Sequence, residues 1–297
     1  MEKIIDLHIH TNCSDGSLTP FEIIDAASTL GLDTISITDH DTILAYTDEL
    51  INYAKDKKIN LIPGVEISTK INKCGIHILG YNIDYKNEEF QTRLAKLQNA
   101  RHDYLYNVAA KLNDLGYVLN TEELDKIEAV TKAHIALDVI ENSANKDLLI
   151  KEFGHIPNKG EFIETVMNEG CKAYVKKETI TPKEAAELIR SVGGKVVIAH
   201  PVAYTYEDNL TEEDIDTIVA DTKADGIEAY YIYLDRNNIK HNDIDKWLKY
   251  TKDKNLFTTF GSDFHNKDGI HPYIGLTGED VKITSQQIDE IIENISE

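Results

Sequence analysis

Strand signals and helix signals alternate along the first 85 residues, and this alternation constrains the fold more than any other feature. A helix signature at 19–31 begins with Thr19 and Glu22 in capping-box positions and ends at a glycine. A second helix is expected at 42–58. The expected strands cover 3–7, 33–38, 60–68 and 75–83. Repeated strand–helix units of this kind predict an α/β fold with a mainly parallel sheet or barrel.

The middle of the chain, residues 86–180, has a different pattern. Apolar residues recur there at helical spacing, and we find no convincing strand. The alternation resumes at 181, with helices expected at 181–194, 211–224 and 239–255 and strands at 195–200, 225–232 and 256–265. We therefore predict one α/β domain from residues 1–85 and 181–297, interrupted by a small helical domain at 86–180.

Histidines and carboxylates follow the expected strands. The first strand leads into "DLHIH" (6–10), where alternation would put Asp6, His8 and His10 on one face. By itself this motif also fits a half-exposed edge strand. Similar groups at seven strand ends are not plausibly accidental, because the carboxyl ends of parallel strands open onto one face. The candidate metal ligands are His8, His10, Asp15, His40, Glu66, His77, His200, Asp263 and His265.

Imidazole and carboxylate ligands without cysteine suit manganese, iron or zinc. Nine candidates are too many for one ion, so we expect two or three divalent metal ions. Clusters of this kind recur in phosphoester hydrolysis, where two ions contact the attacking and leaving oxygens.

Composition excludes some partners and compartments. The formal net charge of −21 argues against a protein that coats DNA or RNA through a basic surface. No apolar run reaches the roughly 18 residues needed to span a membrane, and no signal peptide is recognisable at the start. Three cysteines without a paired spacing suggest a reducing compartment. We expect a cytoplasmic protein whose oligomeric state the sequence does not define.

The motifs "DLHIHT", "TDHD", "GVEIS", "HILGY", "AHP" and "GSDFH" occur in this order over nearly the whole chain. Together they resemble the PHP (polymerase and histidinol phosphatase) family of metal-dependent phosphoesterases. The insertion and "GIEAYY" (226–231) resemble the branch that removes the 3′-phosphate from nucleoside 3′,5′-bisphosphates, whose relatives shorten small RNAs from the 5′ end. The resemblance implies a distorted seven-stranded (β/α) barrel with a trinuclear metal site. The expected substrate is a small nucleotide or short RNA.

The resemblance also implies an assignment of ligands to ions. His8, His10, Glu66 and Asp263 match the ligands of one ion. The second set is Asp15, His40 and His265, and the third is Glu66, His77 and His200. Glu66 is thus expected to bridge two ions, and His40 or His265 to assist proton transfer. Asp6 is expected to orient a ligand histidine. The role of Glu228 is left open: it lies either at the rim of the site or behind a ligand, which it supports.

Basic residues of the insertion are the candidates for holding a substrate phosphate. Arg101 interrupts an apolar stripe, which means that its side chain either reaches the helix edge or contacts an anion. The candidate set is Arg93, Arg101, His102, Lys132 and His134.

Three other functions stay open at this point. A histidinol-phosphate-type phosphatase would use the same centre on another substrate. A barrel amidohydrolase also begins with HxH, but such enzymes usually bridge their metals with a carbamylated lysine after the fourth strand, where we find no suitable lysine. A non-catalytic metal-binding module fits poorly with a complete ligand set.

Overall fold

The computed structural model describes residues 3–72, 74–127, 130–176, 179–235, 239–266, 272–276 and 283–296. The chain folds into two compact units. The first comprises Met1–Leu94 with Ile180–Glu297, and the second is Ala95–Thr179. The first unit contains all nine candidate metal ligands. The domain boundaries expected from the sequence stay a prediction.

The first unit is built on two sheets and a short hairpin. The smaller sheet is entirely parallel and has the order β1-β2-β3 (Ile5–Ile9, Thr34–Ile37 and Asn60–Leu61). The larger sheet has the order β10-β7-β6-β5-β4 (Phe257–Phe260, Gly226–Tyr230, Lys195–Ile198, Cys74–Tyr81 and Gly64–Ile71). Strands β8 (Tyr233–Leu234) and β9 (Lys240–His241) form the hairpin.

The direction of one strand differs from the parallel arrangement expected. Strand β5 is antiparallel to both β4 and β6, because it pairs directly with the preceding strand, Ile71 opposite Cys74, and no crossover helix separates the two. The strand expected at 60–68 is also divided, with β3 ending at Leu61 and β4 starting at Gly64. The chain therefore leaves the small sheet at this point and enters the large one.

The two sheets approach each other at the strand ends that bear the candidate ligands. Isolated bridges join Ile9 to Phe264 and His40 to Glu66. The described strands thus form two sheets in contact, and not a continuous seven-stranded ladder. The mixed α/β class is as expected, whereas the seven-stranded barrel is not confirmed.

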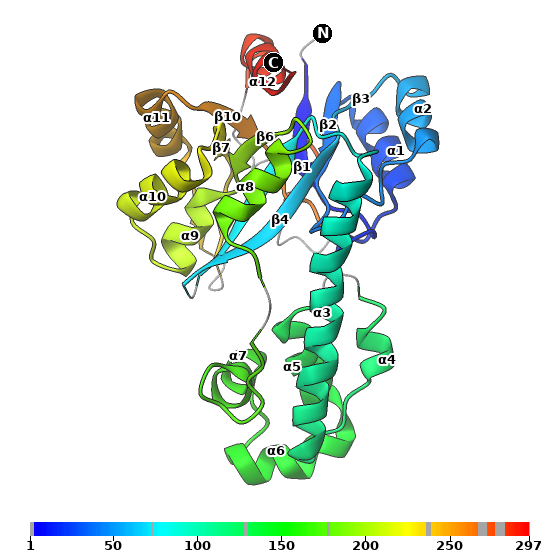
Figure 1. The fold of residues 1–297 in the computed structure, drawn as a ribbon, viewed down its shortest axis with the longest axis vertical. Helices are drawn as coiled ribbons and strands as arrows, with labels where there is room; N and C mark the ends of the chain where they lie inside the picture. Colours follow the sequence, from blue (N-terminus) through cyan, green and yellow to red (C-terminus); the bar gives the residue numbers. More distant parts are fainter. Residues whose placement is uncertain are drawn as a thin grey trace. The chain divides into compact units, whose positions relative to one another are not determined.

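Helices flank these sheets (Figure 1). Their bounds are α1 Pro20–Leu30, α2 Asp48–Asp56, α8 Pro182–Arg190, α9 Pro201–Glu207, α10 Glu212–Thr222, α11 Ile244–Lys254 and α12 Ser285–Ser296. Helix α1 has the predicted capping box, with Thr19 and Glu22 bonded reciprocally and Gly31 in the left-handed region. The sequence analysis did not anticipate α9 or α12. Apolar residues of the strands, α11 and α12 form the core.

Helix α2 begins six residues later than the helix expected at 42–58. The buried Tyr46 explains the difference, because its hydroxyl accepts hydrogen bonds from the amides of Ile37 (3.1 Å) and Gly64 (2.8 Å). The same hydroxyl lies 2.6 Å from the Ile37 carbonyl oxygen. This side chain links the ends of two strands and holds residues 42–47 as a loop beside the candidate site.

The second unit is helical, as the sequence pattern predicted. Its elements are α3 (Glu88–Asp114, which begins in the first unit), α4 Thr121–Leu124, α5 Lys132–Glu141, η1 Ser143–Asn145, α6 Lys146–Phe153, α7 Lys159–Phe162 and the π-helical turn η2 Ile163–Met167. Leu105, Val108 and Leu112 of α3 are fully buried in its apolar core. This unit has a core of its own.

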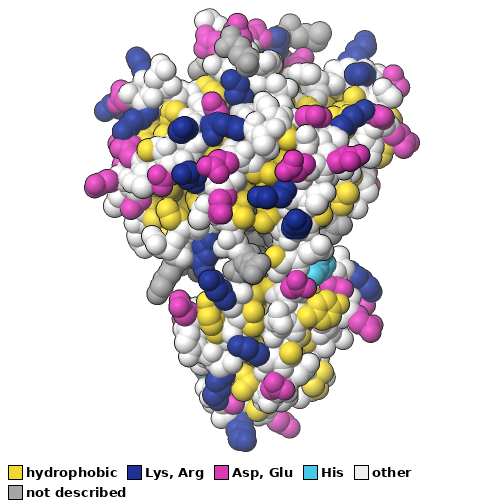
Figure 2. Space-filling model, viewed as in Figure 1, with side chains coloured by type: hydrophobic (Ala, Val, Ile, Leu, Met, Phe, Trp, Pro, Cys, Tyr) yellow, Lys and Arg dark blue, Asp and Glu magenta, His cyan; other side chains and the backbone are white. Residues whose placement is uncertain are grey.

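Charged side chains of both signs are interspersed over the face of each unit shown in Figure 2. A mixed surface of this kind is typical of a solvated exterior. None of the described helices is both long and apolar enough to cross a membrane.

Candidate metal centre

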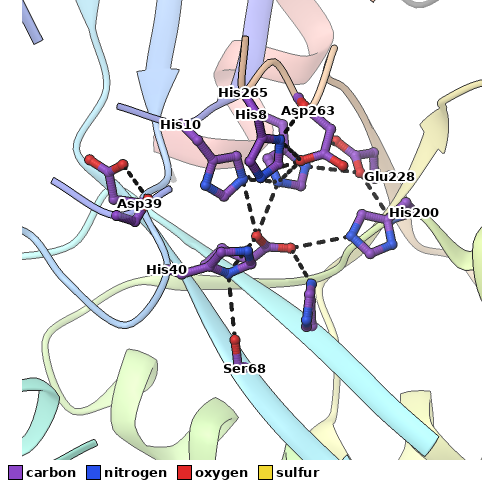
Figure 3. A network of polar contacts seen from close by, with 12 residues as sticks. His8, His10, Asp39, His40, Ser68, His200, Glu228, Asp263 and His265 are labelled. Carbon is purple, nitrogen blue, oxygen red and sulfur yellow. Dashed lines mark hydrogen bonds and ion pairs between the residues drawn. The ribbon is translucent and has the colours of Figure 1, made fainter. Parts of the chain in front are cut away.

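The nine candidate ligands gather where the strands of the first unit end. His8 lies on β1, and His10 follows its last residue; both are fully buried, as is Glu66 on β4. His200 and Asp263 follow β6 and β10, and both have a positive φ (23° and 53°). Such strained backbone is concentrated at functional sites. Figure 3 shows the rings of His8, His10, His40, His200 and His265 clustered together.

Four ligand atoms, two of them from β1 and the residue that follows it and one each from β4 and the segment after β10, lie at the spacing of a metal coordination shell. His8 Nε2 and His10 Nε2 are 3.1 Å apart. Asp263 Oδ1 lies 3.2 Å from each of these nitrogens, and Glu66 Oε2 lies 3.4 and 3.2 Å from them. Four ligands at about 2.0–2.1 Å from a tetrahedral ion are separated by about 3.3 Å. These five distances therefore match the separations expected between ligands of one ion.

Two more groups of ligand atoms adjoin the first. One consists of His10, Asp15, His40 and His265, and the other of His40, Glu66 and His77. The first group shares His10 with the second group and Glu66 with the third. The second and third groups share His40. His200 Nε2 lies 3.3 Å from Glu66 Oε1 and so adjoins the third group. The geometry brings all nine candidates together, while their role as ligands stays a prediction.

Several polar atoms of the cluster lack the hydrogen bonds that burial normally demands. Among the described residues, the buried atoms His10 Nδ1, Glu66 Oε2 and His200 Nδ1 have no hydrogen-bond partner. An unsatisfied buried polar group costs about 1–3 kcal/mol. Glu66 Oε2 has three ring nitrogens within 3.4 Å but accepts a hydrogen bond from none of them. Coordination of a cation would satisfy Glu66 Oε2, so the residues around this oxygen fit a metal centre.

The electrostatics of the protein chain alone lead to the same conclusion. Burial would raise the pKa of Glu66, but the adjacent His77, His40 and His8 hold that pKa well below its usual value. Burial lowers the pKa of His10, whereas Asp263 and Glu66 raise it more strongly, to about 10. Because His8 Nε2 is only 3.1 Å from His10 Nε2, protons on both nitrogens would repel each other. Metal ions supply this positive charge without crowding protons between the rings.

Buried side chains around the cluster hold the ligands in place. Asp6 accepts hydrogen bonds from the amides of His8 (3.2 Å), Ser262 (3.0 Å) and Gly275 (2.8 Å), so it fixes the backbone and not a histidine ring. Burial raises the pKa of Asp6 to about 6, although these hydrogen bonds act in the opposite direction. Asp39 bonds the loop beyond β1 through the amide (2.7 Å) and the hydroxyl (2.6 Å) of Thr11.

Two supporting interactions were missed or left open in the sequence analysis. The Tyr231 hydroxyl donates to Asp263 Oδ2 (3.0 Å), and Glu228 lies 3.0 Å from His8 Nδ1. Glu228 is fully buried and so is not a rim residue. Its position two residues after the start of a buried strand, "GIEAYY", was the only available signal, because a carboxylate inside such a strand needs a partner.

Gly261 leaves the space that this arrangement needs. A Cβ atom at this position would overlap both the Glu228 carboxylate and the His8 side chain. We expect Gly261→Ala to destabilise the metal-free protein by about 1–3 kcal/mol, the usual cost of overpacking, and to lower its bound metal. Denaturant unfolding and elemental analysis measure both effects. Gly75→Ala in β5 is the control, since a Cβ there meets open space. Equal behaviour of the two variants would contradict the expectation.

The basic residues proposed to hold substrate come from both units of the chain. Arg93 is an exposed residue on the first-unit part of α3. In the second unit, His102 Nδ1 lies 2.7 Å from Asp125 Oδ1, and Lys132 donates to Asn168 (2.9 Å). His134 takes part in the capping box of α5. The side chain of Arg101 lies outside the described part of the structure.

Known proteins are similar to this chain in sequence and in fold. The PHP domain family matches residues 6–195. A 5′-3′ exoribonuclease of Haemophilus influenzae is 32% identical over 271 residues, covering 89% of this chain and 91% of the relative. A 3′,5′-nucleoside bisphosphate phosphatase of Chromobacterium violaceum is 26% identical, and the similarity covers 88% of this chain and 87% of that relative. A solved structure from Bifidobacterium adolescentis, proposed to be a metal-dependent phosphoesterase, superposes with a TM-score of 0.71 at 22% identity, covering 98% and 96% of the two chains.

An α/β fold whose strand ends carry a histidine–carboxylate cluster is suited to metal-dependent hydrolysis. The chain belongs to the PHP domain family. It is accordingly an enzyme, a metal-dependent phosphoesterase.

Proposed function

We propose that the enzyme hydrolyses the phosphoester at the 3′ oxygen of a 5′-phosphorylated nucleoside. The principal candidate substrate is a nucleoside 3′,5′-bisphosphate, which would release inorganic phosphate and a nucleoside 5′-monophosphate. The observation that carries the proposal is the linked set of ligand groups around Glu66, which suits the phosphoester chemistry of its family. The name of the Chromobacterium violaceum relative supports this substrate.

A second candidate, 5′-3′ exoribonuclease activity on short RNA, is favoured by the relative from Haemophilus influenzae and by one from Escherichia coli at 29% identity. The two candidate reactions have the same chemistry. In both, water attacks the phosphorus on the 3′ oxygen of a 5′-phosphorylated nucleoside, and the 3′ oxygen leaves. They differ only in whether that phosphorus carries a further nucleotide.

The nine clustered residues are the proposed ligands of two or three Mn, Fe or Zn ions. When bound, such ions neutralise phosphoryl oxygens and lower the pKa of the attacking water. Glu66 would hold two of the ligand groups together. His40 and His265 are each only partly exposed, with side-chain exposures of 11% and 15%, and Asp15 lies 3.7 and 3.4 Å from their rings. This position makes them the candidates for moving a proton to the leaving oxygen.

The phosphate that does not react is proposed to be bound by basic residues chosen from Arg93, Arg101, His102, Lys132 and His134. This part of the proposal rests on the resemblance and on the interrupted apolar stripe of α3.

A panel of defined substrates tests the proposed function. With Mn²⁺ present, we expect phosphate release from nucleoside 3′,5′-bisphosphates to exceed release from nucleoside 5′-monophosphates by at least about 10²-fold in kcat/KM, about 2.7 kcal/mol. A 5′-phosphorylated trinucleotide separates the candidates, because the exoribonuclease would release 5′-mononucleotides from it.

His155→Gln is a purification control, since that histidine is exposed in the second unit. A protein active on histidinol phosphate but on neither nucleotide substrate would contradict the proposal.

A further inference from the structure

Glu228 on β7 is a fully buried carboxylate that belongs to none of the three ligand groups. Its two oxygens lie 3.0 and 3.1 Å from His8 Nδ1. Oε2 also accepts a hydrogen bond from the backbone amide of His200 (2.9 Å). One buried carboxylate therefore contacts two of the proposed ligands, which come from different strands.

The contact with His8 determines which ring nitrogen presents its lone pair to the cluster. Next to a carboxylate, Nδ1 carries the proton and donates it in a hydrogen bond. Nε2, which lies 3.2 Å from Asp263 Oδ1 and 3.1 Å from His10 Nε2, is then the unprotonated ligand atom. A carboxylate in this position fixes both the tautomer and the orientation of a metal-binding imidazole.

The contact with His200 stabilises an unusual backbone conformation. His200 has φ 23° and ψ 59°, immediately before Pro201 and the first turn of α9. Its amide would lose its partner without Glu228, and its ring faces Glu66 Oε1 at 3.3 Å. The same carboxylate that orients the His8 ring thus holds the backbone from which a second imidazole reaches the cluster.

The surroundings leave Glu228 little freedom to move. A side chain at Gly261 would overlap the Glu228 carboxylate, so this glycine provides the space that it occupies. The buried Tyr231, three residues further along the chain, donates to Asp263 Oδ2 and leaves Oδ1 to face His8 and His10. Figure 3 shows Glu228 beside His8, Asp263 and His200.

We propose that Glu228 is a positioning residue that presets the His8 ring and the His200 backbone for metal binding without itself binding metal. The inference rests on the metal centre of the proposed function but not on the identity of the substrate.

Glu228→Gln is the sharpest variant, because it preserves the size of the side chain. Whichever way the amide is turned, its NH₂ group faces a donor, either His8 Nδ1–H or the His200 amide. Calorimetric titration of the metal-free protein with Mn²⁺ should show affinity reduced by about 10–100-fold, the usual loss when such a partner is removed. Long-range ¹H–¹⁵N spectra of the Zn²⁺-loaded proteins should show His8 protonated at Nδ1 in the wild type and a mixture of tautomers in the variant.

Asp225→Asn is the matched control. Asp225 lies immediately before the first residue of β7. It accepts hydrogen bonds from the Val196 amide (2.8 Å) and Arg190 (3.2 Å). This variant should lose some stability but keep the wild-type Mn²⁺ affinity and His8 tautomer. Unchanged affinity in Glu228→Gln, or an equal loss in both variants, would overturn the proposal.

The titration is also independent of the substrate assignment. If the wild type binds Mn²⁺ tightly but cleaves none of the nucleotide panel, the proposed function fails while the role of Glu228 is still measured.

Discussion

Glu66→Gln should lower turnover of a small aryl phosphate by at least about 10²-fold, as expected for the loss of a key electrostatic group in an active site. Glu66 is shared by two ligand groups, and its oxygens lie within 3.4 Å of the rings of His8, His10, His40, His77 and His200. Glutamine removes the charge and places an NH₂ group among these nitrogens. Elemental analysis should therefore show that the variant loses more than one metal equivalent.

Glu184→Gln is the matched control for Glu66→Gln. Glu184 is exposed and forms the capping box of α8 with Thr181, and glutamine serves equally well at that capping position. This control should retain full activity and metal content. His77→Asn offers a graded comparison, because His77 occurs in only one ligand group and its loss should affect one ion. A Glu66→Gln enzyme with near-normal turnover and full metal would refute the bridging role.

The sequence predicted those parts of the site that depend on local periodicity. In β1, alternation predicted that Asp6, His8 and His10 share one face, and His8 Nε2 and His10 Nε2 indeed lie 3.1 Å apart. The helix signatures at Thr19 and Thr181 produced capping boxes as predicted. Such features depend on neighbouring residues, whose geometry is fixed by the backbone.

Features that depend on long-range contacts could not be predicted in this way. The antiparallel direction of β5 follows from its pairing with the preceding strand β4, and the loop at 42–47 follows from hydrogen bonds between Tyr46 and two strands. Glu228 and His8 are 220 positions apart, so no local pattern could pair them. The expectation that Asp6 orients a ligand histidine left out its partners Ser262 and Gly275 for the same reason, since they come from the other end of the chain.

Removal of the metal ions should greatly lower both the activity and the stability of the enzyme. Chelation is expected to lower kcat/KM by about 10³-fold, which corresponds to about 4 kcal/mol of lost transition-state stabilisation. Return of Mn²⁺ or Zn²⁺ should restore activity, with more than one ion per chain by elemental analysis. Each ion at 100 times its Kd should also stabilise the fold by about 2.7 kcal/mol, because it binds the folded state only.

Calcium is the discriminating control for this experiment. Ca²⁺ prefers six to eight oxygen ligands, whereas six of the nine clustered residues are histidines. Thermal unfolding should therefore move to higher temperature with Mn²⁺ or Zn²⁺ and stay almost unchanged with an equal concentration of Ca²⁺. A protein that is stabilised equally by Ca²⁺ would bind cations through its acidic surface, and one that holds at most a single Mn²⁺ after reconstitution would lack the linked ligand groups. Either result would contradict a multinuclear centre built on Glu66, His10 and His40.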